Sequence, residues 1–219
     1  LVATSLNNLA GLLQEGGEYA AARPLYERAL RINEQALGPA HPEVATSLNN
    51  LADLLQITGD YSGARPLYER ALAIREQALG PMHPDVATSL NSLAVLLKAT
   101  GDYPGARALY ERGLHIFETV LGPTHLHVAA ILHNLAGLLQ VTGNYAAARP
   151  LYERALTIRE QALGPTHPNV AATLDALALL FQVTGDYAAA RPLYERGLKI
   201  QEQVLGPTHP DIAQSLNNF

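Results

Sequence analysis

The feature that most constrains this chain is internal copying, because one sequence pattern returns every 42 residues. The pattern reads LxNNLAxLLQxTGDYxxARPLYERALxIxEQALGPxHPxVATS, and all 10 tyrosines fall at two of its positions. The first position holds Tyr19, Tyr61, Tyr103, Tyr145 and Tyr187, and the second holds Tyr26, Tyr68, Tyr110, Tyr152 and Tyr194. A fixed period of this size is typical of stacked supersecondary units that bury their apolar faces against their neighbours. We expect such an array to present a surface that holds partners.

The composition excludes several other classes of protein. Apolar residues make up 48% of the 219 residues, which is typical of a folded chain and too many for a disordered one. No apolar run is long enough to span a bilayer, and no signal peptide is visible. The absence of cysteine excludes disulfides and thiolate metal sites and fits a reducing, cytoplasmic location. The net charge of -5 argues against a nucleic-acid binder, which would show a basic stripe.

Each repeat divides into two predicted helices, helix A and helix B. In the second repeat the apolar stripe of helix A has the i, i+3, i+4, i+7 spacing, and helix A is expected to run for about fourteen residues from Pro42. Gly59 suits a left-handed helix end, and Asp60 is placed to cap helix B. Helix B is predicted over 61–79. The stripe of helix A is Leu48, Leu51, Ala52 and Leu55, and that of helix B is Ala64, Leu67, Tyr68, Ala71, Leu72 and Ile74.

These residues resemble the tetratricopeptide repeat family, in the 42-residue form of kinesin light chains. In the second repeat the matching positions are Leu48, Leu51, Ala52, Leu55, Gly59, Tyr61, Ala64, Tyr68 and Ala71. The family's usual tryptophan is leucine here, and its closing proline is replaced by Glu76 within a longer helix B. The resemblance implies an all-α, right-handed α-solenoid of stacked antiparallel helix pairs, with helices A lining a concave groove that takes peptides.

We expect one array over the whole chain. The predicted repeats span about 1–42, 43–84, 85–126, 127–168 and 169–210, followed by the start of a sixth helix A at 211–219. Because the sequence begins and ends inside a repeat, it is interpreted as a piece of a longer array.

The resemblance also indicates which side chains of helix A face the groove. In the second repeat these are Thr46, Asn49, Asn50, Asp53, Gln56 and Ile57. Asparagine recurs among them, at Asn7, Asn8, Asn49, Asn50, Asn91, Asn134, Asn217 and Asn218. An amide both donates and accepts, so a ladder of amides suits the backbone of a bound peptide. The alternative is that each asparagine satisfies a neighbouring helix. Differences between repeats, such as His133 and Asp175 in place of asparagine, are candidates for specificity, and Gln140 continues the glutamine position.

A clamp for a C-terminal carboxylate is not expected, because it needs several lysines or arginines on helices A and only Lys98 qualifies. The group formed by Lys98, His133 and Asn134 is the best candidate for binding an acidic ligand. The alternative is a solvated lysine.

Recurring histidines invite a metal interpretation, which spacing argues against. They are His41, His83, His125, His167 and His209. Successive copies should lie about 10 Å apart, whereas a zinc–nitrogen bond is about 2 Å long. We expect each to cap a helix A. A second group, His115, His125, His127 and His133, lacks an acidic ligand pattern, so no metal site and no cofactor are predicted.

Charged residues of helix B recur as Arg and Glu at i, i+4, and they indicate a solvated outer face. The pairs are Arg65 with Glu69, Arg107 with Glu111, Arg149 with Glu153 and Arg191 with Glu195. A further glutamate, Glu34 and its equivalents, is interpreted as part of the same solvated face; the alternative is that it joins an arginine of an adjacent repeat. No nucleophile, base and orienting group converge, and no phosphate-binding glycine loop is present, so an enzyme is not expected.

The sequence therefore predicts an interaction scaffold with a protein or peptide partner, and no nucleic-acid or membrane partner. One alternative is a sensor or autoinhibitory domain of a larger bacterial signalling protein. Others are end-to-end self-association through the apolar faces of the terminal repeats, and a consensus array without an evolved ligand.

Overall fold

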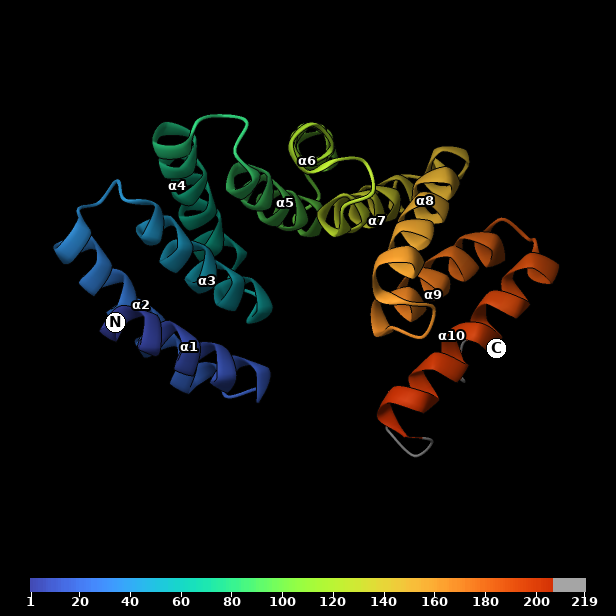
Figure 1. Cartoon of the computed structure of the whole chain (residues 1–219), viewed down its shortest axis with the longest axis horizontal. Coiled ribbons are helices and arrows are strands. Elements are labelled where there is room, and N and C mark those ends of the chain that lie inside the picture. The colour runs from blue at the N-terminus through green and yellow to red at the C-terminus, as the bar shows by residue number, and fades with distance from the viewer. Residues whose placement is uncertain (207–219) are drawn as a thin grey trace. The chain divides into compact units, whose positions relative to one another are not determined.

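Each repeat folds as two helices, as the periodicity predicts. The structure, a computed structural model, describes residues 1–206, and this part contains ten α-helices and no strand (Figure 1). Helices A are α1 (Val2–Glu15), α3 (Pro42–Ile57), α5 (Pro84–Ala99), α7 (Leu126–Val141) and α9 (Pro168–Val183). Helices B are α2 (Tyr19–Leu37), α4 (Tyr61–Leu79), α6 (Tyr103–Leu121), α8 (Tyr145–Leu163) and α10 (Tyr187–Leu205). The all-α solenoid class is confirmed.

The bounds of helix B are as predicted, whereas helix A is slightly longer than expected. Helix α3 has 16 residues and continues to Ile57, where about fourteen were expected. Ile57 lies outside the apolar stripe and is exposed, so periodicity gives no signal for it. The backbone nevertheless stays helical there, because the N–H of Thr58 still donates to the carbonyl of Leu54, 3.0 Å away.

Side chains next to the helix N-termini cap the helices at the positions that the sequence predicts. The imidazole Nδ1 of His41 accepts a hydrogen bond from the backbone N–H of Glu43 at 3.2 Å, which confirms the capping role. The same cap occurs at His83, His125 and His167, and His209 lies outside the described residues. Asp60 caps α4 by accepting from the N–H of Gly63 at 2.9 Å.

The turn between helix A and helix B depends on a glycine. Gly59 has φ of 83°, in the left-handed region that favours glycine. This conformation ends α3 and lets the N–H of Asp60 bond to the carbonyl of Leu55 at 2.8 Å. Because the turn is so short, α4 folds back against α3.

The hydrophobic core is shared between repeats. Val44, Leu48, Ala71 and Ile74 form a buried cluster of the second repeat, and Leu30 of the first repeat packs on it. The equivalent cluster of the fifth repeat receives Leu156 of the fourth. Apolar faces are therefore buried against neighbouring repeats, as the period predicts. In the predicted stripe of helix B, the larger Leu67 and Leu72 are only partly buried.

The chain divides into two compact units, Leu1–Ile116 and the part from Phe117 onward, and α6 crosses the boundary. In the first unit α1, α3 and α5 are in backbone contact in a row, while α2 and α4 are not in such contact with each other. In the second unit α7 and α9 are in contact, and α8 and α10 are not. Within each unit, helices A are therefore packed closer to one another than helices B are. No helix in the described part of the chain is long and apolar enough to cross a membrane.

Arginine and glutamate join the helices B of successive repeats, so the alternative interpretation of Glu34 and its equivalents is the correct one. The outer ion pairs are Arg70–Glu34 at 2.7 Å, Arg112–Glu76 at 2.6 Å, Arg154–Glu118 at 2.6 Å and Arg196–Glu160 at 2.5 Å. The predicted i, i+4 pairs are also present, with an Nε–Oε1 distance of 2.8 Å for Arg65 and Glu69. Their side chains are about half exposed, so each pair contributes at most about 1 kcal/mol.

Candidate functional site

The predicted site residues lie on the close layer of helices A. Those in the first unit are Asn7, Asn8, Thr46, Asn49, Asn50, Asp53, Gln56, Asn91 and Lys98. Those in the second unit are His133, Asn134, Gln140 and Asp175. Asn217 and Asn218 lie outside the described residues. The predicted group of Lys98, His133 and Asn134 is divided between the two units and stays a prediction.

One series of asparagines lies between successive helices A. Asn49 is 6% exposed, and its Nδ2 donates to the hydroxyl of Ser89 on α5 at 3.4 Å. Asn7 donates in the same way to Ser47 on α3 at 3.3 Å. The carbonyl oxygens of both amides are buried and have no hydrogen-bond partner within the described part of the chain. These amides thus join neighbouring repeats and still carry an unused acceptor.

The second series of asparagines is more open. Asn8 on α1 is exposed, and Asn50 on α3 is partly exposed. Among the residues that the structure describes, neither side chain makes a hydrogen bond. Since α1 and α3 are in contact, two free amides stand one repeat apart on adjacent helices.

Asp53 and Gln56 are brought together around a buried tyrosine. The hydroxyl of Tyr68 donates to Oδ1 of Asp53 and also lies 3.2 Å from Oε1 of Gln56. Burial raises the pKa of Asp53, and the hydrogen bond from Tyr68 and the charge of Arg75 partly offset this effect. Burial, with the charge of Asp53, also raises the pKa of Tyr68. Both side chains are therefore committed to contacts inside the repeat.

The tyrosine–glutamine contact recurs in other repeats. Tyr152 donates to Gln140 at 3.1 Å, and Tyr194 donates to Gln182 at 2.9 Å. Burial raises the pKa of Tyr152 to about 12. In the third repeat the glutamine position is occupied by Lys98, which is partly buried, and burial lowers the pKa of this lysine.

Asp175 is turned toward its own helix B. Its Oδ2 accepts from Nε2 of Gln201 at 2.8 Å, and its Oδ1 lies where a side chain at Gly197 would begin. The second repeat has Ala71 at the position of Gly197. Three residues of the fifth repeat that differ from those of the second thus act together, because Gly197 leaves space for Asp175 and Gln201 donates to it. Burial raises the pKa of Asp175.

The histidines do not gather into one site. The rings of His125 and His127 lie 5.0 Å apart, and His127 stacks on Phe117 at 4.9 Å. His133 instead meets the ring of Tyr152 edge-on at 5.4 Å. Burial, with the charge of His125, lowers the pKa of His127. Over residues 1–206 no three histidine or acidic side chains are grouped so that they could hold a metal ion.

Sequence reasoning missed a set of inner polar contacts between repeats. Arg75 of α4 is buried and donates to the hydroxyl of Ser89 at 2.7 Å and to Oγ1 of Thr46 at 3.3 Å. The equivalent contacts are Asn33 to Ser47 at 2.9 Å and Arg159 to Thr173 at 2.5 Å. In the third repeat the equivalent of Arg75 is Phe117, the position of Ser89 holds Ile131, and both are buried. The two residues of each contact lie 14 positions apart and change together from repeat to repeat, and this covariation could have indicated the contacts.

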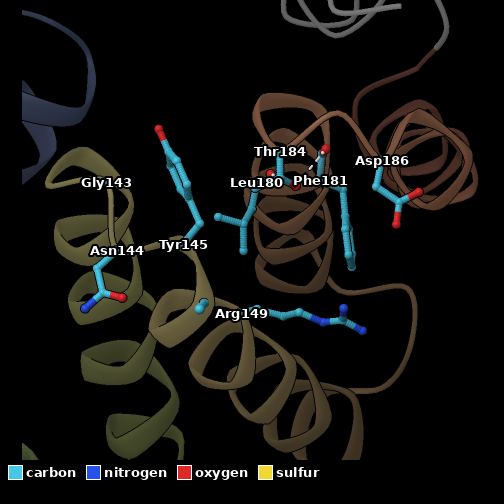
Figure 2. Close-up of a pocket in the computed structure, with 9 residues that line it drawn as sticks. Gly143, Asn144, Tyr145, Arg149, Leu180, Phe181, Thr184 and Asp186 are labelled. Carbon is cyan, nitrogen blue, oxygen red and sulfur yellow. Dashed lines mark hydrogen bonds between the residues drawn. The ribbon is translucent and has the colours of Figure 1, made fainter.

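The structure also contains a hollow that the sequence did not indicate. In the second unit a cavity of about 520 Å³ lies between the start of α8 and the end of α9. Figure 2 shows the guanidinium of Arg149 beside the ring of Phe181, 4.9 Å from its centre. An equivalent cavity of about 640 Å³ is lined by Tyr19, Arg23 and Leu55 in the first unit. No predicted site residue lines either cavity.

Comparisons with known proteins agree with this architecture. The tetratricopeptide repeat family model matches residues 1–77, 49–119, 85–140, 127–203 and 176–219. The crystal structure of BtubC (BKLC) from P. vanneervenii is similar at 28% identity and a TM-score of 0.77, covering 94% of this chain and 81% of that chain.

A Podosopora anserina putative kinesin light chain with nearly identical repeats is similar at 30% identity and a TM-score of 0.73. That match covers 91% of this chain and 95% of the other. The comparison with curated proteins gives no match. Because the family model matches along the whole length, the chain belongs to the tetratricopeptide repeat family.

Proposed function

We propose that this array is a scaffold that binds a peptide segment of a partner protein along the helices A of its first unit. Tetratricopeptide repeat proteins are generally protein-interaction scaffolds and are typically not enzymes. The observation that carries the proposal is the pair of free amides, Asn8 and Asn50, on the adjacent helices α1 and α3. Each amide offers one donor and one acceptor to a peptide unit, whatever the side chain of that peptide residue.

The spacing of the helices favours an extended ligand. Packed helices lie about 8–10 Å apart, so equivalent amides on adjacent helices A are separated by about that distance. A polyproline II segment rises about 3.1 Å per residue and presents the same side every three residues, a repeat of about 9.3 Å. Every third residue of such a segment would therefore meet the same position of successive repeats.

Asn7 and Asn49 support the face from behind, because each amide donates to a serine of the next helix A and holds neighbouring repeats together. Asp53 and Gln56 contribute shape to the face, because their polar atoms already make contacts within the second repeat.

The test is a selection of random 12-residue peptides displayed on phage against the immobilised chain. Kd is then measured by fluorescence polarisation for the chain and for the double variant Asn8→Ala/Asn50→Ala. We expect at least a tenfold weaker Kd for this variant, and less than a twofold change for the outer control Glu69→Ala. Failure to enrich any peptide, or an equal loss in the control, would contradict the proposal.

The exposed face of α1 favours a second candidate, self-association. Leu12 is 66% exposed, whereas its equivalent Leu54 is 1% exposed. Val2 and Leu9 are also exposed, although Val44 and Leu51 at the same positions are buried by the preceding repeat. Since a repeat of this sequence buries these positions inside the chain, we propose that a repeat of a second copy covers them.

Sedimentation velocity over a concentration series tests this second candidate. The weight-average sedimentation coefficient is expected to rise with concentration, and Leu9→Glu/Leu12→Glu should abolish the rise. A coefficient that does not depend on concentration would rule out self-association through α1.

A further inference from the structure

The third repeat departs from its neighbours at one buried contact. In repeats four and five the inner tyrosine donates its hydroxyl hydrogen to the glutamine of helix A, and in repeat two the hydroxyl lies between that glutamine and Asp53, to which it donates. The first repeat keeps a glutamine, Gln14, although its side-chain oxygen is buried without a partner. The third repeat has Lys98 at this position, and an ammonium group has no lone pair with which to accept.

The substitution leaves two donors without an acceptor. Tyr110 is 1% exposed, and Lys98 is partly buried on α5. In the first unit, as far as the structure describes it, neither side chain makes a hydrogen bond or an ion pair. The third repeat therefore has a hydroxyl donor and an ammonium donor, and neither has an acceptor within the first unit.

The charges around Lys98 make a negative acceptor the best fit. Lys98 is the one lysine or arginine on the five helices A. The carboxylate of Asp53, on the adjacent α3, accepts from Tyr68 and lies near Arg75, so its charge is engaged within the second repeat. Val95, one helical turn before Lys98, replaces the aspartate of the second repeat and brings no charge of its own.

We propose that the Lys98 ammonium and the Tyr110 hydroxyl bind the side-chain carboxylate of an aspartate or glutamate in the partner peptide. This inference rests on the proposed function and adds a position-specific preference for an acidic residue at the third repeat. A carboxylate has two oxygens, so one can accept from the lysine and the other from the tyrosine.

The chain offers a direct measurement, because it contains two lysines, Lys98 and the exposed Lys199 on α10. Protein labelled with ¹³C and ¹⁵N at lysine is titrated with N-acetyl-glutamate N-methylamide and, separately, with the glutamine analogue. We expect the Lys98 signals to shift saturably with the glutamate compound only, while the Lys199 signals stay in place. Bound carboxylate should also raise the pKa of Lys98, since a nearby anion favours the charged form.

Two variants separate this site from a general charge effect. Tyr110→Phe removes only the hydroxyl and should weaken the glutamate compound about threefold to tenfold, which corresponds to one hydrogen bond. Lys98→Gln restores the residue of the other repeats; in uniformly ¹⁵N-labelled protein, the backbone amide signals of α5 should no longer respond to the glutamate compound. Lys199→Gln should change nothing.

The result that overturns the inference is a Lys98 signal that moves no more than the Lys199 signal, or that moves equally with the glutamine compound. Inorganic phosphate is run in parallel, and tighter binding of phosphate would overturn the assignment to a carboxylate. These experiments distinguish the inference from the proposed function. A Lys98 response without any enriched peptide would contradict only the proposal that the chain is a peptide-binding scaffold. Enriched peptides with a silent Lys98 would contradict only the acidic preference.

Discussion

The outer and inner contacts between repeats differ in how strictly they are copied. On the outer side, the same arginine meets the same glutamate at every junction of the described repeats, at 2.5–2.7 Å. On the inner side, the equivalent positions hold Asn33 with Ser47, Arg75 with Ser89, and Arg159 with Thr173, or the apolar Phe117 and Ile131. The outer contacts thus use the same ion pair at each junction, whereas the inner contacts use different residue pairs from one junction to the next.

This difference shows that the repeats differ from one another mainly at their inner, buried polar positions. A solvated ion pair contributes little free energy, so its uniformity reflects a shared stacking geometry. A buried polar group must find a partner, so each inner change requires a matching change nearby. Asp175, Gly197 and Gln201 form such a matched set, whereas Lys98 replaces a glutamine without giving Tyr110 an acceptor.

The largest expected effect comes from removing the inner arginine of the second repeat. Arg75→Ala deletes a buried side chain and its hydrogen bonds to Ser89, Thr46 and the carbonyl of Asp85. The free energy of unfolding should fall by about 3 kcal/mol. Urea unfolding followed by circular dichroism measures it. Arg75→Asn, which copies the first repeat, should lose less, and a fall below about 1 kcal/mol in the alanine variant would contradict the inner role of this residue.

The next effect has the opposite sign. Lys98→Gln should stabilise the protein by about 1 kcal/mol, because glutamine gives the hydroxyl of Tyr110 an acceptor and removes a half-buried charge. Thermal unfolding in parallel with Tyr110→Phe and the double variant checks the cause. The gain should vanish when the tyrosine is already phenylalanine, and a gain that persists there would show that charge alone is responsible.

A pH-dependent effect is expected at Asp53. Burial raises the pKa of this carboxyl above its unfolded value, so the folded state binds the proton more tightly. Both states are protonated below the unfolded pKa, and stability contributed by the group is lost as pH rises through the folded pKa. Compared with Asp53→Asn, the natural chain should therefore lose stability from about pH 4 upward and level off above the raised pKa.

Urea unfolding of both chains at a series of pH values measures this difference. Asp60→Asn is a suitable contrast, because hydrogen bonds from Gly63 and Ser62 lower the pKa of Asp60. The difference between that variant and the natural chain should change with pH in the opposite direction. Parallel curves for natural chain and Asp53→Asn would show that Asp53 titrates normally.

The smallest effect is expected on the outer side. Arg70→Ala removes the ion pair with Glu34, in which the arginine side chain is 41% exposed and the glutamate side chain 30%. The free energy of unfolding should fall by at most about 0.5 kcal/mol. The same urea series measures it, with added salt as a check, since screening should shrink the difference further. An outer loss as large as that of Arg75→Ala would remove the contrast between the two layers.

The sequence predicted those features that depend on neighbours along the chain. The bounds of α4, the left-handed Gly59, the caps at Asp60 and His41 and the i, i+4 pairs each follow from residues within one or two turns. The outer pairs between repeats were available from the sequence only as an alternative to a solvated face, because the strict period repeats the residues without showing which of them meet.

The inner contacts were less accessible to sequence reasoning. Asn49 was interpreted as a ligand-binding residue with a helix-satisfying alternative, and the structure places its amide against Ser89, 40 residues away. The role of Arg75 and the cavity beside Phe181 were not predicted. Each depends on how one repeat rests on the next, which periodicity fixes only in outline.

Mapping the bound peptide by NMR tests the central claim most directly. Backbone amide shifts of the chain are recorded with and without the tightest peptide from the display selection. The account predicts that the large shifts fall on α1, α3 and α5, including the amide side chains of Asn8 and Asn50. Large shifts confined to α2 and α4, on the side of the outer ion pairs, would contradict it.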